Sequence, residues 1–217
     1  NNFIPFSRKV DISITNLECP LTERDHPINK VGPVLKAPLT SAQALKHAGF
    51  NVACLANNHI MDFGAPGLQD TMEQLKKKNI HYVGAGESAD EAGRPLFLEV
   101  NNRRLALINI AEHEFSIASS KKYGAAPVDP LVNYYQISEA KEQSDFLMLV
   151  VHGGHEMYSF PSPRMQQLYR YYIDLGVDVV IGHHPHVFSG YEIYNGKPIF
   201  YSLGNFIFDR QSTNQKW

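Results

Sequence analysis

The chain has 217 residues, of which 43% are hydrophobic, so it is long enough to bury a sizeable core as one large or two small domains. Its formal net charge is −2 and its pI is about 6.6, and it lacks the basic stripe that marks a nucleic-acid-binding surface. No stretch of the given sequence approaches the roughly 18 consecutive apolar residues of a membrane-spanning helix.

The first half of the chain predicts strands that alternate with helices, judged from hydrophobic periodicity and from capping residues. Glycine ends the first helix, and four prolines predict an irregular loop before it. The predicted elements are a strand over 10–17, a loop over 19–38, a helix over 39–48, a strand over 50–56 and a helix over 66–78.

The rest of the chain adds hairpins to this alternation, and we expect each half of the domain to combine helix-linked strands with a hairpin. Asn101-Asn102 and Asn195-Gly196 stand between apolar runs, and asparagine and glycine tolerate the positive φ of tight hairpin turns. Ser162-Pro163 predicts a helix start, with a capping residue followed by proline in the first turn. The predicted elements are strands over 96–100 and 104–110, a loop over 112–129, a helix over 134–143, a strand over 145–151, a helix over 162–175 and strands over 177–181 and 199–203.

Polar residues follow the predicted strands at the points where these strands end. The densest group is Gly182-His183-His184-Pro185-His186, directly after the predicted strand over 177–181, which is rich in β-branched residues. In a sheet whose helix-linked strands run parallel, these ends lie on one edge, so residues distant in sequence can converge there. The alternative is a polar loop whose histidines have no common role. The residues at strand ends are Glu18, Asn58, His59, His152, His184 and His186.

This set combines a carboxylate, an amide oxygen and several imidazole nitrogens. Such a mixed set suits zinc, manganese or iron, whereas calcium and magnesium prefer oxygen ligands alone. We therefore predict a site for one or two divalent metal ions, with the choice among Mn, Zn and Fe left open. Two ions about 3.5–4 Å apart would need a bridging carboxylate, and Glu18 is the natural candidate.

Five motifs in one order make the chain resemble the bacterial poly-γ-glutamate capsule-synthesis (CapA-type) family. The resemblance covers nearly the whole chain, and five ordered motifs are far more specific than any single one. The motifs are Asn16-Leu17-Glu18-Cys19-Pro20-Leu21, Asn57-Asn58-His59-Ile60-x-Asp62-Phe63-Gly64, His152-Gly153-Gly154-x-Glu156, Gly182-His183-His184-Pro185-His186 and Ser202-Leu203-Gly204-Asn205-Phe206.

The resemblance implies a fold as well as a family. The capsule-synthesis family is similar to the calcineurin-like metallophosphoesterases, whose α/β fold is a four-layer αββα sandwich of two mixed β-sheets flanked by helices. We therefore expect a single metallophosphoesterase-like domain over residues 1–217.

The resemblance also implies roles for the residues at the strand ends. Glu18 is similar to the superfamily's metal-bridging carboxylate, with glutamate in place of the usual aspartate. Asn58 and His152 resemble ligands of the second metal ion. His184 and His186 resemble the closing pair of ligands, one facing each ion.

Further residues are expected to act beside the metal ligands. His59 resembles the histidine that stabilises or protonates the reacting phosphate group. His183 is an additional histidine that could orient a ligand by a hydrogen bond. Asn16, Glu156 and Asn205 could support the site or bind substrate, although ordinary loop capping is an equally good interpretation.

The sequence departs from the family pattern at its start. The superfamily begins with an aspartate on its first strand, and the capsule-synthesis family usually has a Gly-Asp pair there. No such pair precedes Val10. Asp11 lies inside the predicted strand and not at its end, so it is not assigned as a ligand. Either the given sequence lacks this first strand, or the first metal site is incomplete in this protein, and we expect the former. Asp62 is interpreted as a turn residue and not as a ligand.

Two functions remain open from the sequence. The ligand set favours a metal-dependent hydrolase that cleaves a phosphoester or an amide such as a γ-glutamyl linkage, with activated water as the nucleophile. The family name favours a non-hydrolytic accessory protein for making or exporting the capsule polymer. A purely structural α/β domain is the third and plainest alternative.

The expected partners follow from these functions. They are an anionic polymer or a phosphoester substrate, and membrane-bound capsule machinery, with no nucleic acid. The resemblance implies a bacterial protein that is either cytoplasmic or anchored to the membrane through a segment outside the given sequence. The sequence leaves its oligomeric state open.

Overall fold

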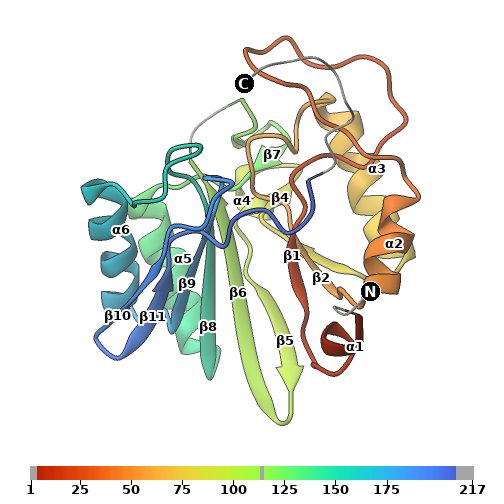
Figure 1. Ribbon diagram of the computed structural model, residues 1–217. Coiled ribbons are helices and arrows are strands. Elements are labelled where there is room, and N and C mark those ends of the chain that lie inside the picture. The colour runs from red at the N-terminus through yellow and green to blue at the C-terminus, as the bar shows by residue number, and fades with distance from the viewer. Residues whose placement is uncertain (1–3, 113–114, 209–217) are drawn as a thin grey trace.

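The computed structural model describes residues 4–112 and 115–208, and it arranges two main β-sheets and their helices in layers (Figure 1). The first sheet has three parallel strands in the order β1-β2-β3. Helices α2 and α3 connect these strands and cover the outer face of the sheet. The bounds are β1 Ile14–Asn16, α2 Ser41–Ala48, β2 Val52–Cys54, α3 Gly64–Lys77 and β3 His81–Val83.

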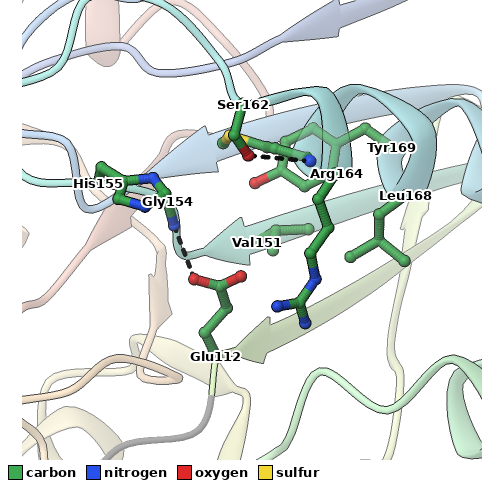
Figure 2. Close-up of a pocket in the computed structure, with 9 residues that line it drawn as sticks. Glu112, Val151, Gly154, His155, Ser162, Arg164, Leu168 and Tyr169 are labelled. Carbon is green, nitrogen blue, oxygen red and sulfur yellow. Dashed lines mark hydrogen bonds between the residues drawn. The ribbon is translucent and has the colours of Figure 1, made fainter.

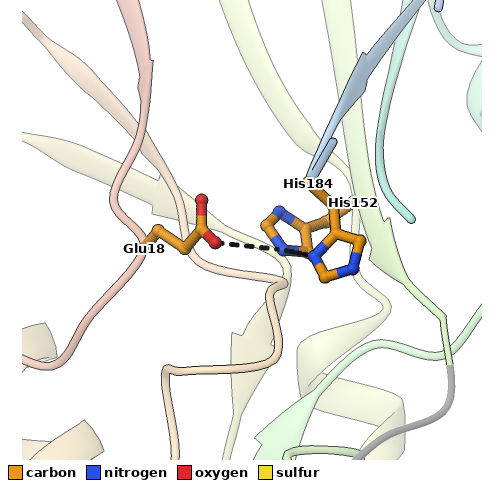
Figure 3. A group of neighbouring side chains, drawn as sticks. All are labelled: Glu18, His152 and His184. Carbon is orange, nitrogen blue, oxygen red and sulfur yellow. Dashed lines mark hydrogen bonds and ion pairs between the residues drawn. The ribbon is translucent and has the colours of Figure 1, made fainter. Parts of the chain in front are cut away.

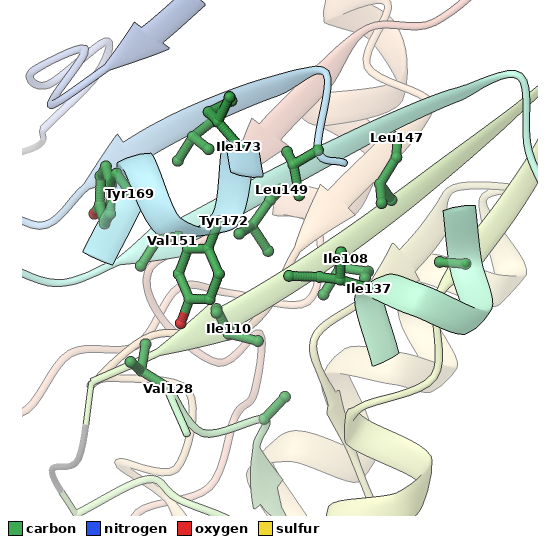
Figure 4. Packing of buried hydrophobic residues seen from close by; sticks show 14 of the residues in the cluster. Ile108, Ile110, Val128, Ile137, Leu147, Leu149, Val151, Tyr169, Tyr172 and Ile173 are labelled. Carbon is green, nitrogen blue, oxygen red and sulfur yellow. The ribbon is translucent and has the colours of Figure 1, made fainter. Parts of the chain in front are cut away.

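The second sheet has six strands in the order β10-β11-β9-β8-β6-β5. Its central strands are parallel, and an antiparallel hairpin forms each edge. Helices α5 and α6 cover its outer face, where their apolar side chains pack into a hydrophobic cluster (Figure 4). The bounds are β5 Leu96–Val100, β6 Arg103–Ala111, α5 Pro130–Glu142, β8 Phe146–His152, α6 Pro163–Asp174, β9 Val179–His183, β10 Tyr191–Tyr194 and β11 Lys197–Phe200.

Short elements complete the described part of the chain. A two-stranded antiparallel pair joins β4 and β7. None of the helices in residues 4–112 and 115–208 has the length and apolar character needed to cross a bilayer. The remaining bounds are α1 Ile4–Ser7, β4 Ala85–Gly86, α4 Ala89–Ala92 and β7 Gly124–Ala125.

The inner faces of the two main sheets pack against each other. Side chains alternate along a strand, so β2 directs Val52 and Cys54 inward and places Ala53 beneath the helices. On the opposite sheet, Leu107 and Val150 face these side chains. Burying one such apolar side chain contributes roughly 1.5–3 kcal/mol. The layers are therefore helix, sheet, sheet and helix, which confirms the predicted four-layer α/β architecture.

Helix α6 forms as its sequence predicts. Ser162 accepts a hydrogen bond from the backbone N–H of Met165 at 3.2 Å, and Pro163 occupies the first turn. Tyr169 and Tyr172, in the predicted inward stripe, are buried in the cluster beneath the helix. Helix α5 begins four residues earlier than predicted, because the preceding Asp129 caps its first turn.

Three other predictions differ from the structure in detail. The strand expected over 10–17 is reduced to Ile14–Asn16, and Asp11 lies in a bend before it. Strand β3 was not predicted because three residues are too few to establish a periodicity. Both hairpins belong to the six-stranded sheet, one at each edge, and the three-stranded sheet is wholly parallel within the described residues.

Asn109 on β6 connects the two sheets through its buried amide. Its Oδ1 accepts the N–H of Ala56 just beyond β2 at 2.7 Å, and its Nδ2 donates to the carbonyl of Val150 at 3.2 Å. Gly84, at φ +92°, leaves room for this amide, because a Cβ there would lie 2.2 Å from Oδ1. The carboxyl ends of β2 and β8 are thus fixed relative to each other.

We expect Asn109→Ala to lower the free energy of unfolding by about 1–3 kcal/mol, because it leaves the buried N–H of Ala56 without an acceptor. Urea denaturation measures this change. The exposed Asn29→Ala is the matched control, and its effect should stay within about 0.5 kcal/mol. Equal effects from the two substitutions would contradict a connecting role for Asn109.

Candidate metal centre

Polar side chains border the apolar core between the two sheets at the carboxyl ends of the strands. On β8 the inner-facing row runs from Val150 to His152, and both residues are buried. On β1 the row begins at Ile14 and, continued at the same spacing, reaches Glu18. The alternation that buries the apolar residues between the sheets therefore also directs polar residues toward one another at the sheet edge.

Five of the side chains named from the sequence meet at this edge. Nε2 of His152 lies 3.0 Å from Oδ1 of Asn58 and 3.2 Å from Nδ1 of His184. Oε1 of Glu18 lies 3.6 Å from Nε2 of His152 and 3.6 Å from Nε2 of His186. Figure 3 shows Glu18 approaching His152 and His184 from the segment after β1.

Most of the unpaired buried polar atoms of the described residues lie at this place. Five buried side-chain oxygen or nitrogen atoms of the described residues have no hydrogen-bond partner, and three of the five are here: Oε1 of Glu18, Nδ1 of His152 and Oδ1 of Asn16. A buried acceptor without a partner is costly, so such a cluster is expected where a ligand completes the bonding. The donor set of carboxylate, amide oxygen and imidazole fits a transition-metal ion.

Burial and neighbouring charges adjust the protonation of these ligand candidates. Burial, followed by the charge of His184, lowers the pKa of His152 well below its ordinary value, so this imidazole is neutral at neutral pH. Burial raises the pKa of Glu18, while His186 and His59 act in the opposite direction. A neutral imidazole has a free nitrogen lone pair, which is the form that binds a metal ion.

A second group of ligand atoms lies beside the first. Glu156, His184 and His186 each offer an atom within 4.8 Å of the others, and Glu18, His152 and His184 form the first group by the same distance. Glu156 was predicted only as a supporting or substrate-binding residue. Its carboxylate is placed where it could also act as a ligand.

The turn that carries the closing histidines has an unusual backbone. His184 has φ 96° and His186 has φ 61°, which is the left-handed region that side chains other than glycine seldom adopt. Nδ1 of His186 lies 2.9 Å from Oδ1 of Asn205, on the loop after β11. Residues in this conformation persist only where their surroundings hold them, and they cluster at functional sites.

His59 is held by a buried pair of charged residues. Its Nδ1 lies 2.7 Å from Oδ2 of Asp62 and 3.1 Å from Nζ of Lys30. Lys30 also forms an ion pair with Asp62, whose side chain is fully buried and which accepts the N–H of Leu35 at 2.7 Å. The contacts of His59 with these residues are made through Nδ1, on one side of its ring.

Asn16 and His183 differ in how they are placed. Nδ2 of Asn16 donates to Oε2 of Glu18 at 3.0 Å, so Asn16 orients the carboxylate. Burial lowers the pKa of His183 to about 4, and its backbone carbonyl accepts the N–H of Gly153. Within the described residues its imidazole makes no hydrogen bond, so the ligand-orienting role of His183 stays a prediction.

Sequence reasoning missed Lys30 and gave too small a role to Asp62. Asp62 does lie in a turn, as interpreted, but its carboxylate points inward to His59 and Lys30. The spacing of three residues between His59 and Asp62 was a usable signal, because one turn brings such positions together. Lys30 lies in a long irregular loop, and nothing in its local sequence indicates a buried contact.

We expect Asp62→Ala to lower the free energy of unfolding by about 3–5 kcal/mol, because it leaves the ammonium group of Lys30 buried without a counter-charge. The double variant Asp62→Ala with Lys30→Met should recover part of this loss in urea denaturation. Glu73→Ala, which breaks the exposed Lys77–Glu73 pair, is the control and should cost no more than about 0.5 kcal/mol. A similarly small cost for Asp62→Ala would show that the buried pair does not stabilise the loop.

Solved structures resemble this arrangement at the level of the fold. A phosphatase from Mycoplasma pneumoniae superposes with a TM-score of 0.56 and 16% sequence identity, over 90% of this chain and 61% of that structure. This chain therefore shares its fold with that phosphatase, which confirms the predicted fold class.

Two relatives from Bacillus are closer in sequence. The "Capsule biosynthesis protein CapA" of Bacillus anthracis is 38% identical over 188 residues, which are 84% of this chain and 46% of the relative. The "PGA biosynthesis protein CapA" of Bacillus subtilis is 36% identical over 216 residues, which are 98% of this chain and 57% of the relative. The chain therefore spans about half the length of these relatives.

The family model described as "Bacterial capsule synthesis protein PGA_cap" matches residues 1–210. The match includes every residue of the site described above. Together with the two relatives, it means that the chain belongs to the PGA_cap family of bacterial capsule synthesis proteins.

Proposed function

We propose that this chain is a metal-dependent hydrolase of the calcineurin-like phosphoesterase type that acts in capsule or poly-γ-glutamate metabolism. The observation that carries the proposal is the meeting of Glu18, Asn58, His152, His184 and His186 from separate segments of the chain. The unpaired buried atoms of Glu18 and His152 are the second support, because bonding to an ion would satisfy such atoms.

The two groups of ligand atoms suggest how one or two divalent ions would be held. In this proposal Glu18, His152 and His184 bind one ion, with Asn58 adjacent to them, and His186 with Glu156 completes a neighbouring position. Manganese, zinc and iron all suit this donor set. A bound divalent ion supplies a Lewis acid that activates water near neutral pH and polarises the phosphoryl or carbonyl group under attack.

His59 is the proposed acid–base residue. Asp62 and Lys30 contact its Nδ1, which leaves Nε2 as the nitrogen that can give a proton to a leaving group or stabilise its charge. His59 also lies close enough to Glu18 to oppose the rise that burial causes in the pKa of that carboxyl, so both belong to one electrostatic environment. Holding the imidazole from one side fixes the direction of its free nitrogen.

The substrate class follows from the chemistry and from the relatives together. Oxygen polarisation by a metal ion serves both phosphoester and amide hydrolysis, so a γ-glutamyl linkage and a phosphoester are both suitable substrates. The names of the relatives refer to capsule and PGA biosynthesis, which favours a substrate connected with that polymer.

A non-hydrolytic accessory role is the second candidate. It is favoured by the same names, because they refer to biosynthesis and not to cleavage. In that case the bound metal ion would hold an anionic polymer at the metal centre, and the polymer would remain intact. The membrane-bound capsule machinery is the partner class proposed for either role.

We expect His184→Ala to lose bound metal, because it removes the imidazole that is common to both groups. His59→Ala should keep its metal and lose about 10²–10⁴-fold in turnover, which is the usual contribution of a positioned acid or base. Elemental analysis measures the metal, and hydrolysis of an aryl phosphate with added manganese measures turnover. The exposed His26→Ala is the control for both measurements.

The two candidate functions give different results in this experiment. Full metal content without turnover of an aryl phosphate or of a γ-glutamyl oligomer, in the unaltered chain, would favour the accessory role. Unchanged metal content and unchanged activity in both His184→Ala and His59→Ala would contradict the metal centre itself.

A further inference from the structure

A cavity of about 170 Å³ lies between the end of β8 and the first turns of α6 (Figure 2). On β8, Val151 lines this cavity, whereas the neighbouring His152 points to the opposite face and contacts Asn58. The first turn of α6 forms another wall, with Ser162 and Arg164. One water needs only roughly 10–15 Å³, so the cavity has room for a molecule of several non-hydrogen atoms.

Two side chains of opposite charge, Glu112 and Arg164, line the cavity and do not form an ion pair with each other. The carboxylate of Glu112, just beyond β6, is fixed by accepting the N–H of Gly154 at 2.9 Å. The guanidinium of Arg164 extends from α6 toward the same space (Figure 2), and it forms no ion pair with any of the described residues. A ligand that carries both signs of charge could contact both groups.

Tyr169 adds a buried hydroxyl that lacks a partner. Its side chain is 2% exposed, it lines the cavity, and its hydroxyl oxygen makes no hydrogen bond within the described residues. The ring itself is fixed by stacking on Tyr201, with centroids 5.7 Å apart. By contrast, Tyr172 on the same helix bonds its hydroxyl to Asn133 at 2.9 Å. The hydroxyl of Tyr169 is thus the kind of buried group that a bound ligand would satisfy.

We infer that this cavity binds the zwitterionic group of an α-amino acid. The ammonium would lie against Glu112, and the carboxylate would lie against Arg164 and the N-terminal turn of α6, where partial positive charge favours an anion. Tyr169 would bond to the same ligand through its hydroxyl. None of the residues that line the cavity is among the proposed metal ligands, and the binding needs no metal ion.

Two sources can present this chemistry. A free amino acid such as glutamate carries both charges, and so does the amino-terminal residue of a γ-linked glutamyl chain, because its α-carboxylate stays outside the linkage. Interior residues of such a chain have an amide in place of the ammonium and should bind poorly. The connection with the polymer rests on the proposed function, whereas binding of the zwitterion does not.

Calorimetric titration of the full chain with a chelator present tests the inference. The probes are glutamate as each enantiomer, a γ-glutamyl trimer, and glutarate, which lacks the ammonium. Saturable binding of glutamate or the trimer, at least about tenfold tighter than glutarate, is the expected result. Tighter binding of the trimer identifies the polymer end as the ligand, and tighter binding of glutamate identifies the free amino acid.

Substitutions locate the binding. Arg164→Met should weaken it by about tenfold or more, whereas the exposed Arg94→Met should not. Tyr169→Phe should weaken binding by about fivefold without lowering the thermal midpoint, because no protein hydrogen bond is lost. Tyr172→Phe, the matched control on α6, should lower the midpoint and leave affinity unchanged.

Three results would overturn the inference. The first is that neither glutamate nor the trimer binds saturably at millimolar concentration. The second is that glutarate binds as tightly as they do, and the third is that Arg164→Met and Tyr169→Phe both leave the affinity unchanged. None of them bears on the metal centre, because the titration is done without metal. Conversely, loss of metal or turnover in the His184 and His59 variants leaves this binding test unaffected.

Discussion

The apolar contact between the two sheets is the constraint on which the rest of the structure depends. Because side chains alternate along each strand, every second residue of a strand faces the other sheet. Burying these residues fixes which side chains face inward along the whole strand. The residues that continue these rows past the apolar layer, Glu18 and His152 among them, are therefore directed toward one another. The approach of Glu18 to His152 at the sheet edge is thus a geometric consequence of packing the core.

Buried polar groups in this molecule fall into two kinds. The polar groups of the first kind have bonding partners. Asn109 bonds to backbone groups and fixes the two sheets relative to each other, and Lys30 pairs with Asp62, which fixes the loop over His59. The unpaired kind is confined, among the described residues, to atoms of Asn16, Glu18 and His152 at the sheet edge, Tyr169 beneath α6, and Ser116. An unsatisfied buried group costs free energy, and the first two places are those at which we propose that ligands bind.

The sequence predicted the elements with strong local signals and missed those that depend on distant contacts. Asn-Gly in the last hairpin and Ser162-Pro163 at α6 act within a few residues, so their effect can be recognised locally. Lys30 is buried only because a long loop folds over His59, and no periodicity records that contact. Glu112 and Tyr169 are 57 positions apart, and only the packing of α6 on β6 and β8 brings them to one cavity.

The left-handed backbone at His184 and His186 has a consequence for how this family can change. Each such residue stores about 1–3 kcal/mol of strain, which a glycine in the same place would release. Substitutions that relax this turn would thus make the protein more robust while removing the imidazoles it displays. Stability and the proposed metal binding therefore compete at these two positions, and selection for stability alone would replace the two histidines.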